Sequence, residues 1–249
     1  MVLALQIIVV LALIGLWAVL SAVRAFPESA FPSQAQVVAS AWDDLRSGHL
    51  FTDLVASLFR VALGFSAAVL LSTPLGLWLG LRPALRTATL PTVNFFRSLS
   101  PLAWIPFAIL WFGIGDRPAI FLIFMSTFFP LLLSTVAAVA NTPSVYFRVA
   151  QEYGFTEFRL LTRVALPAIL PQVITAIRLA CGLAWLVVVA AEMIAGRDGL
   201  GFSIWDARNG LRVDIVAYRM IVIGVVGLGL DWFLVQFTKL PGLRWAYDA

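Results

Sequence analysis

Cysteine, histidine and lysine are nearly missing from this chain of 249 residues. Cys181 is its single cysteine and His49 its single histidine, so an internal disulfide and a cysteine-based metal cluster are excluded, and a histidine metal site is disfavoured. A Ser/His/Asp hydrolase would have to be built around that one histidine. Lys239 is the single lysine, and no basic cluster is interleaved with aromatic residues, so we expect no nucleic acid as a partner.

Charged residues and phosphate-binding loops are scarce as well. Only 12% of the residues are charged, whereas 61% are hydrophobic. No glycine-rich phosphate loop, Walker pattern or pair of carboxylates suited to acid–base chemistry occurs, so we expect no catalytic residue, metal or cofactor in this chain. Several apolar runs reach the roughly 20 residues needed to cross a bilayer. The composition therefore predicts an all-α fold, a polytopic helical membrane protein in contact with lipid.

Apolar runs divide the chain into about six predicted transmembrane helices within a single domain, residues 1–249. The predicted spans are 3–20, 53–81, 90–112, 119–140, 173–195 and 215–237. The first run, within an N-terminal segment of residues 1–23, could instead be a secretory signal. We favour a retained span, because the run is long and its start carries no lysine or arginine.

Residues 33–50 are more polar and are predicted to form an amphipathic external segment. Ser33 is a suitable N-cap for a helix over 34–46. The apolar residues of that helix fall on one stripe, which comprises Val37, Val38, Ala41, Trp42 and Leu45. The tryptophan favours a helix that lies at the membrane interface, and the alternative is a linker helix packed on the bundle.

Prolines interrupt the third predicted span, which makes it the best candidate for a translocation pathway. Proline removes a backbone hydrogen bond, and a membrane helix tolerates this only where packing or a water-lined cavity compensates. Hydroxyl groups and loosened backbone N–H groups would bind a passing anion weakly, as a pathway requires. The candidate pathway residues in this span are Ser98, Ser100, Pro101 and Trp104. The alternative is a kinked, fully packed helix whose hydroxyl groups bond to other helices.

Two carboxylates lie inside predicted spans, where an unpaired charge is costly. Glu192 is near the end of the fifth span and either pairs with Arg197 or Arg219 or lies at the mouth of the pathway. We favour pairing, because an acidic group beside a path for anions would have to be neutralised. Asp231 of the sixth span is expected to pair with Arg178 or Lys239.

Residues 141–172 are the one long segment in which charges are spaced between apolar residues. Thr142 and Pro143 predict the N-cap and first position of a short helix over 144–153, which ends at Gly154. Thr156 is predicted to cap a second helix over 157–166. Pro167 and Pro171 are predicted to end that helix before the fifth span begins.

Two short helices joined at a glycine between membrane spans would form a knob at the membrane surface. Phe147, Ala150 and Gln151 share one face of the first helix by their spacing. Small side chains there would let a partner surface approach closely, and Phe155 and Phe158 could fill a hydrophobic cleft on it. Glu157, Arg159 and Arg163 are candidates for ion pairs at the rim. The alternative is a loop packed against its own bundle.

This segment resembles the cytoplasmic EAA loop of ABC-importer permeases, whose pattern is Glu-Ala-Ala, three residues, Gly, nine residues, Ile, one residue and Leu-Pro. Ala150 matches the second alanine, Gly154 the glycine, Val164 the isoleucine, and residues 166–167 the closing pair. Arg148 stands where that family has its glutamate, and Val149 follows in place of the first alanine.

The resemblance extends from about Pro32 to the last span and is strongest to the nitrate, bicarbonate, taurine and sulfonate permeases. Three further stretches carry it: 100–106 (SPLAWIP), 111–115 (WFGIG), and 190–193 (AAEM) followed by 199–201 (GLG). It implies a type I ABC-importer permease fold, with residues 53–240 as the permease core and 141–172 as the loop that docks on the ATPase.

What the resemblance implies about partners and location is equally specific. It implies a second copy of the permease, two cytoplasmic ATPase subunits that bind ATP and Mg, and a periplasmic or lipid-anchored substrate-binding protein. The chain would lie in the bacterial inner membrane with both termini in the cytoplasm, and would move a small anion. The implied ATPase-docking residues are Phe147, Arg148, Ala150, Gln151, Gly154, Phe155, Phe158 and Arg159.

An ion-gradient-driven secondary transporter is the alternative function. It would use Glu192 and Asp231 as relay groups and would need no ATPase. No inverted repeat is visible in the sequence, and the polar docking loop has no role in such a carrier, so we favour the ABC importer.

Overall fold

The computed structural model describes residues 2–23, 27 and 30–238, and within this part of the chain every regular element is a helix. Five of these helices are long and apolar enough to cross a membrane, or six if the bent α4–α5 pair is one span, as the sequence predicts. In chain order the elements are α1 Val2–Ala22, α2 Gln34–Ser47, α3 His49–Gly80, α4 Pro83–Ser98, η1 Pro101–Trp104, α5 Ile105–Phe112, α6 Asp116–Asn141, α7 Ser144–Glu152, α8 Glu157–Leu160, η2 Leu161–Ala165, α9 Leu166–Ala195, α10 Leu200–Asn209 and α11 Val213–Thr238.

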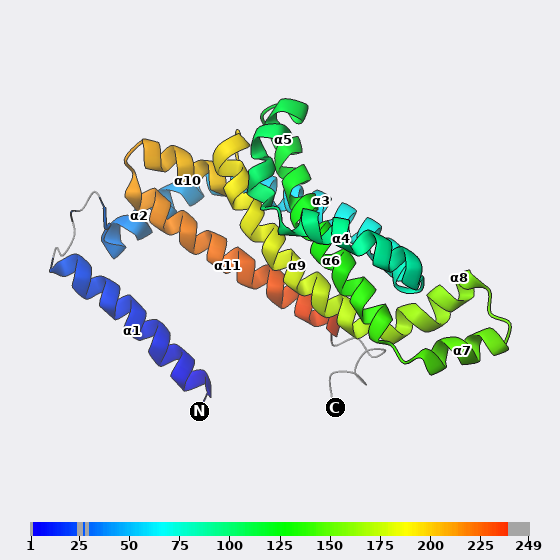
Figure 1. The fold of residues 1–249 in the computed structure, drawn as a ribbon. Coiled ribbons are helices and arrows are strands. Elements are labelled where there is room, and N and C mark those ends of the chain that lie inside the picture. The colour runs from blue at the N-terminus through cyan, green and yellow to red at the C-terminus, as the bar shows by residue number, and fades with distance from the viewer. Residues whose placement is uncertain (1, 24–26, 28–29, 239–249) are drawn as a thin grey trace.

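Helices α3, α6 and α9 form the centre of the bundle, with α11 beside α9 (Figure 1). Small residues bring α3 and α6 together, as expected for membrane helices. A Cβ atom on Gly64 would lie 2.7 Å from the Ile120 carbonyl oxygen, and one on Gly80 would lie 2.5 Å from the Val139 Cβ. The close approach of the two backbones therefore depends on glycine at these positions.

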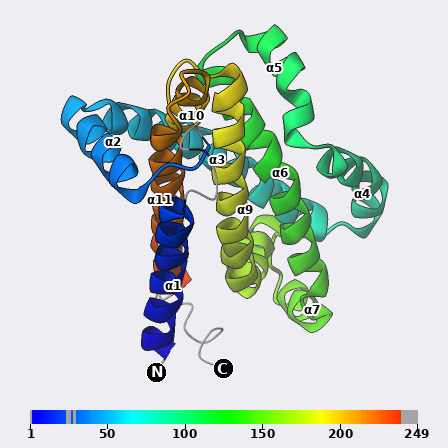
Figure 2. The same cartoon turned by 90° about the vertical axis from the view of Figure 1, so that its left-hand side faces the viewer.

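Helix α1 stands beside this bundle rather than inside it (Figure 2). Its contacts are made near α2, where the Trp17 indole N–H donates to the Pro32 carbonyl at 3.1 Å and the Gln34 amide donates to the Ile14 carbonyl at 2.9 Å. The described side chains of α1 are otherwise largely exposed and apolar, which suits a helix surrounded by lipid.

Helix α2 begins where the sequence predicts. The Ser33 hydroxyl oxygen accepts from the Gln36 backbone N–H, and the Gln36 side-chain oxygen accepts from the Ser33 backbone N–H, which forms a capping box. Val37 is buried, but Val38 and Trp42 of the predicted stripe are 68% and 56% exposed. The stripe is therefore divided: Val37 packs inward, whereas Val38, Trp42 and Leu45 face away from the bundle, which favours the interfacial helix over the packed linker.

The third predicted span differs from expectation in its start and its shape. Its first helix, α4, begins at Pro83 rather than residue 90, and proline fits this position because the first turn of a helix needs no N–H partner. The chain then bends by 82° between α4 and the η1–α5 segment, next to Pro101. The prediction of a broken helix is confirmed.

The predicted stop at Pro167 and Pro171 is wrong. Helices α8, η2 and α9 run on as one helix of 39 residues, Glu157–Ala195. Residues 161–165 form a π-helical turn, in which the Leu166 N–H donates to the Leu161 carbonyl five residues before it. A π turn widens the helix and relieves the clash between a proline ring and the carbonyl of the preceding turn, so the helix passes through Pro167.

Candidate functional site

Helices α7 and α8 project from one end of the bundle (Figure 1), and we call them together the α7–α8 hairpin, residues 144–160. The turn between them requires Gly154, whose φ is +69°. Thr156 caps α8 by accepting from the Arg159 backbone N–H at 3.5 Å, as predicted. Thr142 does not cap α7, because its hydroxyl donates to the Ala138 carbonyl at 3.0 Å and Pro143 takes the cap position.

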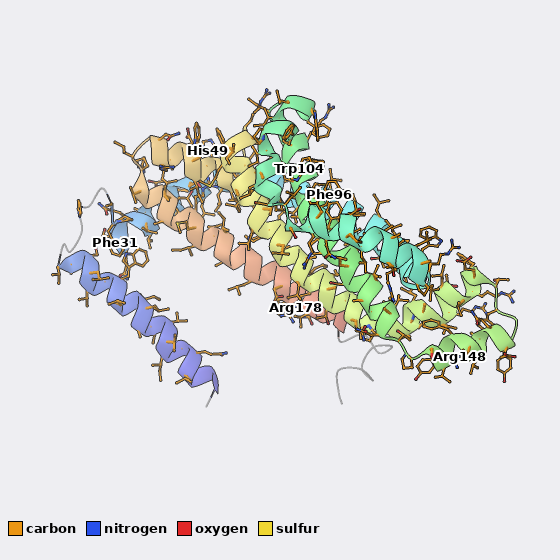
Figure 3. All side chains as sticks on the ribbon, viewed as in Figure 1. Phe31, His49, Phe96, Trp104, Arg148 and Arg178 are labelled. Carbon is orange, nitrogen blue, oxygen red and sulfur yellow. The ribbon has the colours of Figure 1, made fainter. Side chains whose placement is uncertain are left out.

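The face of α7 that the sequence assigns to docking is divided in the structure. Ala150 is 5% exposed, and Phe147 packs against the core that contains Ala138 and Val139. Phe147 therefore holds the hairpin on its own bundle, and Ala150 is not accessible to a partner in this conformation. The other predicted docking positions are accessible: Arg148, Gln151, Gly154, Phe158 and Arg159 are exposed, and Phe155 is half-buried. The Arg148 side chain points away from the bundle in Figure 3.

A second apolar stripe on the hairpin escaped the sequence analysis. Val145, Val149 and Tyr153 are 56%, 48% and 79% exposed, and Phe158 on α8 is 75% exposed. Their spacing of four along α7 places the first three on one face. The spacing of four residues is visible in the sequence and could have identified this stripe. These are the side chains that a partner would cover.

Glu157, a predicted rim residue, has a partner within the chain. Its carboxylate accepts from the Arg82 guanidinium at 2.7 Å, and Arg82 also lies over the Trp78 ring at 4.6 Å. The pair joins α8 to the turn between α3 and α4. Both side chains are about half exposed, so the pair orients the hairpin more than it stabilises the fold.

At the opposite end of the bundle, charged groups gather around Arg60 of α3. Its guanidinium pairs with Glu192 of α9 at 2.7 Å and with Asp116 at the start of α6 at 2.6 Å. It also pairs with the Asp198 carboxylate and donates to the Asp198 carbonyl at 2.9 Å. Arg60 is only 1% exposed, so one buried guanidinium joins α3, α6, α9 and the loop before α10. These four residues are the Arg60 cluster.

Glu192 is fully buried within this cluster. Besides Arg60, its carboxylate accepts from the Ser57 hydroxyl and from the Gly201 backbone N–H, both at 2.9 Å. Glu192 is therefore paired with an arginine, as we favoured, but that arginine is Arg60 and neither of the predicted partners, Arg197 and Arg219. Arg60 escaped the sequence analysis although an arginine inside an apolar span was a visible signal.

The Gly199-Leu200-Gly201 sequence packs closely around the same carboxylate. A Cβ atom on Gly199, whose φ is +101°, would lie 2.5 Å from the Glu192 carboxyl carbon and 2.6 Å from an Arg60 nitrogen. A Cβ atom on Gly201 would lie 2.2 Å from the Val189 carbonyl oxygen. The two glycines thus let the loop before α10 close over the Arg60 cluster.

A second buried arginine lies near this cluster. Arg219 of α11 pairs with Asp44 of α2 at 2.6 Å and with Asp53 of α3 at 2.9 Å. Asp53 also accepts from the Gly199 backbone N–H at 3.1 Å, which links the two groups of charges. The α10 end of the molecule is therefore held by ion pairs and hydrogen bonds between five helices and one loop.

Asp231 pairs with Arg178 through two bonds of 2.5 and 2.7 Å, which confirms one of its predicted partners. The other, Lys239, lies outside the described residues. Both carboxylates that a gradient-driven carrier would use are thus engaged by arginines, and nothing in their geometry favours a relay.

Aromatic rings follow the bent α4–α5 segment and the neighbouring α6. We call the set Phe96, Trp104, Phe107, Trp111, Phe112 and Phe121 the aromatic ladder. Trp104 lies at its centre, with ring centroids 6.4 Å from Phe96 and 6.4 Å from Phe121 (Figure 3). The candidate pathway residues Ser100 and Pro101 lie at the bend itself, in the turn before Trp104. Ser98 donates to the Asn94 carbonyl at 2.8 Å, so its hydroxyl serves its own helix.

Residues 72–239 match the protein family described as binding-protein-dependent transport system inner membrane component. The chain belongs to this family. It is therefore the transmembrane permease subunit of an ABC importer, as the α7–α8 hairpin and the helix pattern predict.

Relatives of this permease include permeases of bicarbonate, taurine and nitrate transport systems. The bicarbonate transport system permease protein CmpB of Synechococcus elongatus is 39% identical over 76% of this chain and 69% of its own length. The taurine transport system permease protein TauC of Escherichia coli is 37% identical over 73% and 66%. The nitrate import permease protein NrtB of Leptolyngbya laminosa is 35% identical over 88% and 80%.

A solved structure of the inward-facing MetNI methionine ABC transporter has the same fold. It covers 76% of this chain and 94% of its own, with a TM-score of 0.68 at 17% identity. The family match begins at residue 72, so the permease's Arg60 lies before it, whereas Gly154 and Glu192 lie within it. The Arg60 cluster therefore joins Glu192, inside the range that matches the family, to Arg60, outside it.

Proposed function

We propose that this permease imports a small anion of the nitrate, bicarbonate or taurine class, driven by two ATPase subunits that bind ATP and Mg on the cytoplasmic side. The observation that carries the proposal is the exposed α7–α8 hairpin at one end of the bundle, opposite the end where α10 lies (Figure 1). A second copy of the permease would complete the path, and a periplasmic or lipid-anchored binding protein would deliver the anion. The chain itself would hold no cofactor and catalyse no reaction.

The choice of substrate class rests on the relatives named above, whose printed substrates are two small anions, bicarbonate and nitrate, and taurine, which carries an anionic sulfonate group. Among the described residues, the bend at Ser100 and Pro101 would supply hydroxyl and backbone N–H groups to such an anion. Weak and successive contacts of this kind suit a solute that has to leave again.

The hairpin is connected to the bundle in a way that suits the transmission of movement. Because Glu157–Ala195 is one continuous helix, a displacement of α8 would be carried along α9. The far end of α9 holds Glu192, which is bonded to α3 through Arg60. ATPase closure against the hairpin would thus tilt α9 together with α3 and α6.

The orientation follows from the docking role. Helix α9 runs from the hairpin to the α10 end, and α11 runs back in the opposite direction (Figure 1). If the hairpin lies in the cytoplasm, α11 therefore ends on the cytoplasmic side. Helix α1 meets α2 at the α10 end, so its first residues also lie on the cytoplasmic side. Both termini would therefore be cytoplasmic, in the inner membrane.

Gly154→Arg tests the docking role. An arginine there would strain a backbone at φ +69° and extend a bulky charge from the turn, so we expect loss of ATPase co-purification and of transport. Gly154→Asn tolerates this backbone and should keep both activities. Asn209→Arg at the other end of the molecule is the control for an added charge. Normal transport by Gly154→Arg without a bound ATPase would refute the assignment.

A further inference from the structure

A cavity of about 360 Å³ lies where the Arg60 cluster meets the end of the aromatic ladder. Its volume lies within the range of small-ligand sites. The residues that matter in its lining are Arg60, Phe112, Asp116, Arg117, Arg197 and Asp198. We propose that Arg117 and Arg197 make this cavity a receiving site for a small oxyanion at the outer end of the permease. The proposal rests on the function proposed above and adds a site to it.

The Arg60 cluster holds the two backbone segments from which these arginines project. Asp116 and Asp198 are both bonded to the Arg60 guanidinium, and Arg117 and Arg197 are their direct neighbours in sequence. The start of α6 and the loop before α10, which are far apart in the chain, are thereby bonded to one buried group, and each presents an arginine beside it. Arg60 of α3 therefore holds together the two backbone segments that carry the pair.

The donors of these two arginines are unused. Arg117 and Arg197 are exposed, and no hydrogen bond or ion pair joins either side chain to another residue that the structure describes. The two aspartates beside them are already engaged by Arg60. A guanidinium offers five N–H donors in a planar fork that matches the oxygens of nitrate, bicarbonate or a sulfonate.

The charge of the lining suits brief capture. Three guanidinium groups and two carboxylates line the cavity, and with Glu192 behind Arg60 these six groups are neutral overall. Attraction for an anion therefore comes from Arg117 and Arg197, which have no carboxylate partner among the described residues. A strongly cationic pocket would retain an anion, whereas a transport site has to release it. The pocket would attract an anion that leaves the binding protein without holding it.

The cavity also adjoins the candidate pathway. Phe112 lines it, and the Phe112 ring centroid lies 5.5 Å from that of Phe121. Phe121 in turn contacts Trp104, next to the bend at Ser100 and Pro101. An anion received between the two arginines would therefore lie at the start of the aromatic ladder that leads to the bend.

The test compares the wild-type transporter with the double variant Arg117→Gln/Arg197→Gln, each assembled with its ATPases and binding protein in proteoliposomes. Uptake of nitrate, bicarbonate and taurine is measured together with ATPase activity over a range of binding-protein concentrations. We expect uptake of the transported anion to fall by roughly tenfold, because two charge-assisted contacts are lost. The binding-protein concentration that half-saturates ATPase activity should not change.

Two matched variants accompany this test. Arg208→Gln removes an exposed arginine of α10 that does not line the cavity, and it should transport normally. The double lysine variant, Arg117→Lys/Arg197→Lys, keeps the charge and should retain most of the uptake. Thermal unfolding of each variant should match the wild type, since both arginines are exposed and bonded to no described residue.

Three outcomes would overturn the proposal. If the double glutamine variant takes up the anion as fast as the wild type does, the arginines receive no anion. A deficit that excess binding protein restores would instead make them contacts for that protein. If the wild-type transporter moves none of the three anions, the proposed function fails first, and the receiving site fails with it.

Discussion

Arg60 and Glu192 are buried charges that stabilise each other. Each would be costly to bury alone, and the geometry compensates by bonding both carboxylate oxygens of Glu192, one to Arg60 and the other to the Ser57 hydroxyl and the Gly201 backbone N–H. Such a pair often adds little net stability over two apolar side chains, but the loss of one member leaves an uncompensated charge in the interior. The cluster therefore specifies how α3, α6 and α9 fit together at this end.

The charge balance leads to a prediction for single and double variants. Arg60→Met should lower the free energy of unfolding by about 3–5 kcal/mol, because Glu192 stays buried without its cation. Arg60→Met/Glu192→Met should cost clearly less than the two single variants together, since no buried charge is left between α3 and α9. Thermal unfolding of the purified permease measures this coupling.

The exposed Arg82–Glu157 pair, between the turn after α3 and the projecting hairpin, is the control. Removing Arg82 should change stability far less than removing Arg60, because water replaces the lost partner. Strictly additive effects at Arg60 and Glu192 would mean that the pair is not coupled.

The sequence identifies these charges but not their pairing. Glu192 and Arg60 each stand out as ionisable residues in apolar runs. They are separated by 132 positions, and only the packing of α3 against α9 brings them together. Arg197 and Arg219 are nearer in sequence to Glu192, which is why they seemed better partners. Pairing between distant helices depends on tertiary geometry that one sequence does not contain.

At the scale of whole elements, features set by a few neighbouring residues were predictable. Ser33 and Thr156 cap their helices, and Gly154 closes the turn, because each depends on bonds within about four residues. The continuation of the helix through Pro167 was not predictable in this way. It requires a π turn before the proline, and the surrounding bundle selects that turn over a break.

The π turn sets the rotation of α8 relative to α9. Pro167→Ala, with no change of chain length, should convert this segment to regular α-helix. Because the π turn holds about one residue more per turn, this conversion should rotate α8 by about 100°. Phe158 and Arg159 would then face a new direction while α9 stays in place. We expect ATPase co-purification to fall by roughly tenfold or more, as when a central interface contact is lost.

Pro167→Ala combined with deletion of Thr162 removes the extra residue of the π turn and serves as the control. Helix α8 should then keep roughly its original direction, and the ATPase should bind normally. ATPase affinity is measured on the purified permease, whose thermal unfolding shows whether the Pro167→Ala variant is folded. A Pro167→Ala variant that is folded and binds the ATPase as the wild type does would mean that the direction of α8 is unimportant for docking.

At the scale of the molecule, the two ends of the bundle have contrasting chemistry. The α7–α8 hairpin has exposed aromatic and aliphatic side chains. The α10 end is instead held together by buried arginines and contains the proposed receiving cavity. Transport in one direction needs such a difference, because the ATPases act at one end and the anion arrives at the other. The proposed function thus requires the two ends to lie on opposite sides of the membrane.

Site-directed labelling tests this requirement. Cys181 is buried, so a Cys181→Ser background provides a chain without thiols, into which Tyr153→Cys or Asn209→Cys is introduced separately. Tyr153 is 79% exposed at the tip of the hairpin, and Asn209 is exposed at the end of α10. A membrane-impermeant thiol reagent added to intact spheroplasts should label position 209 and not 153, and inverted vesicles should give the reverse. Labelling of position 153 from outside would place the hairpin where no ATP-driven subunit can reach it, and the coupling between nucleotide hydrolysis and the tilt of α9 would have no physical basis.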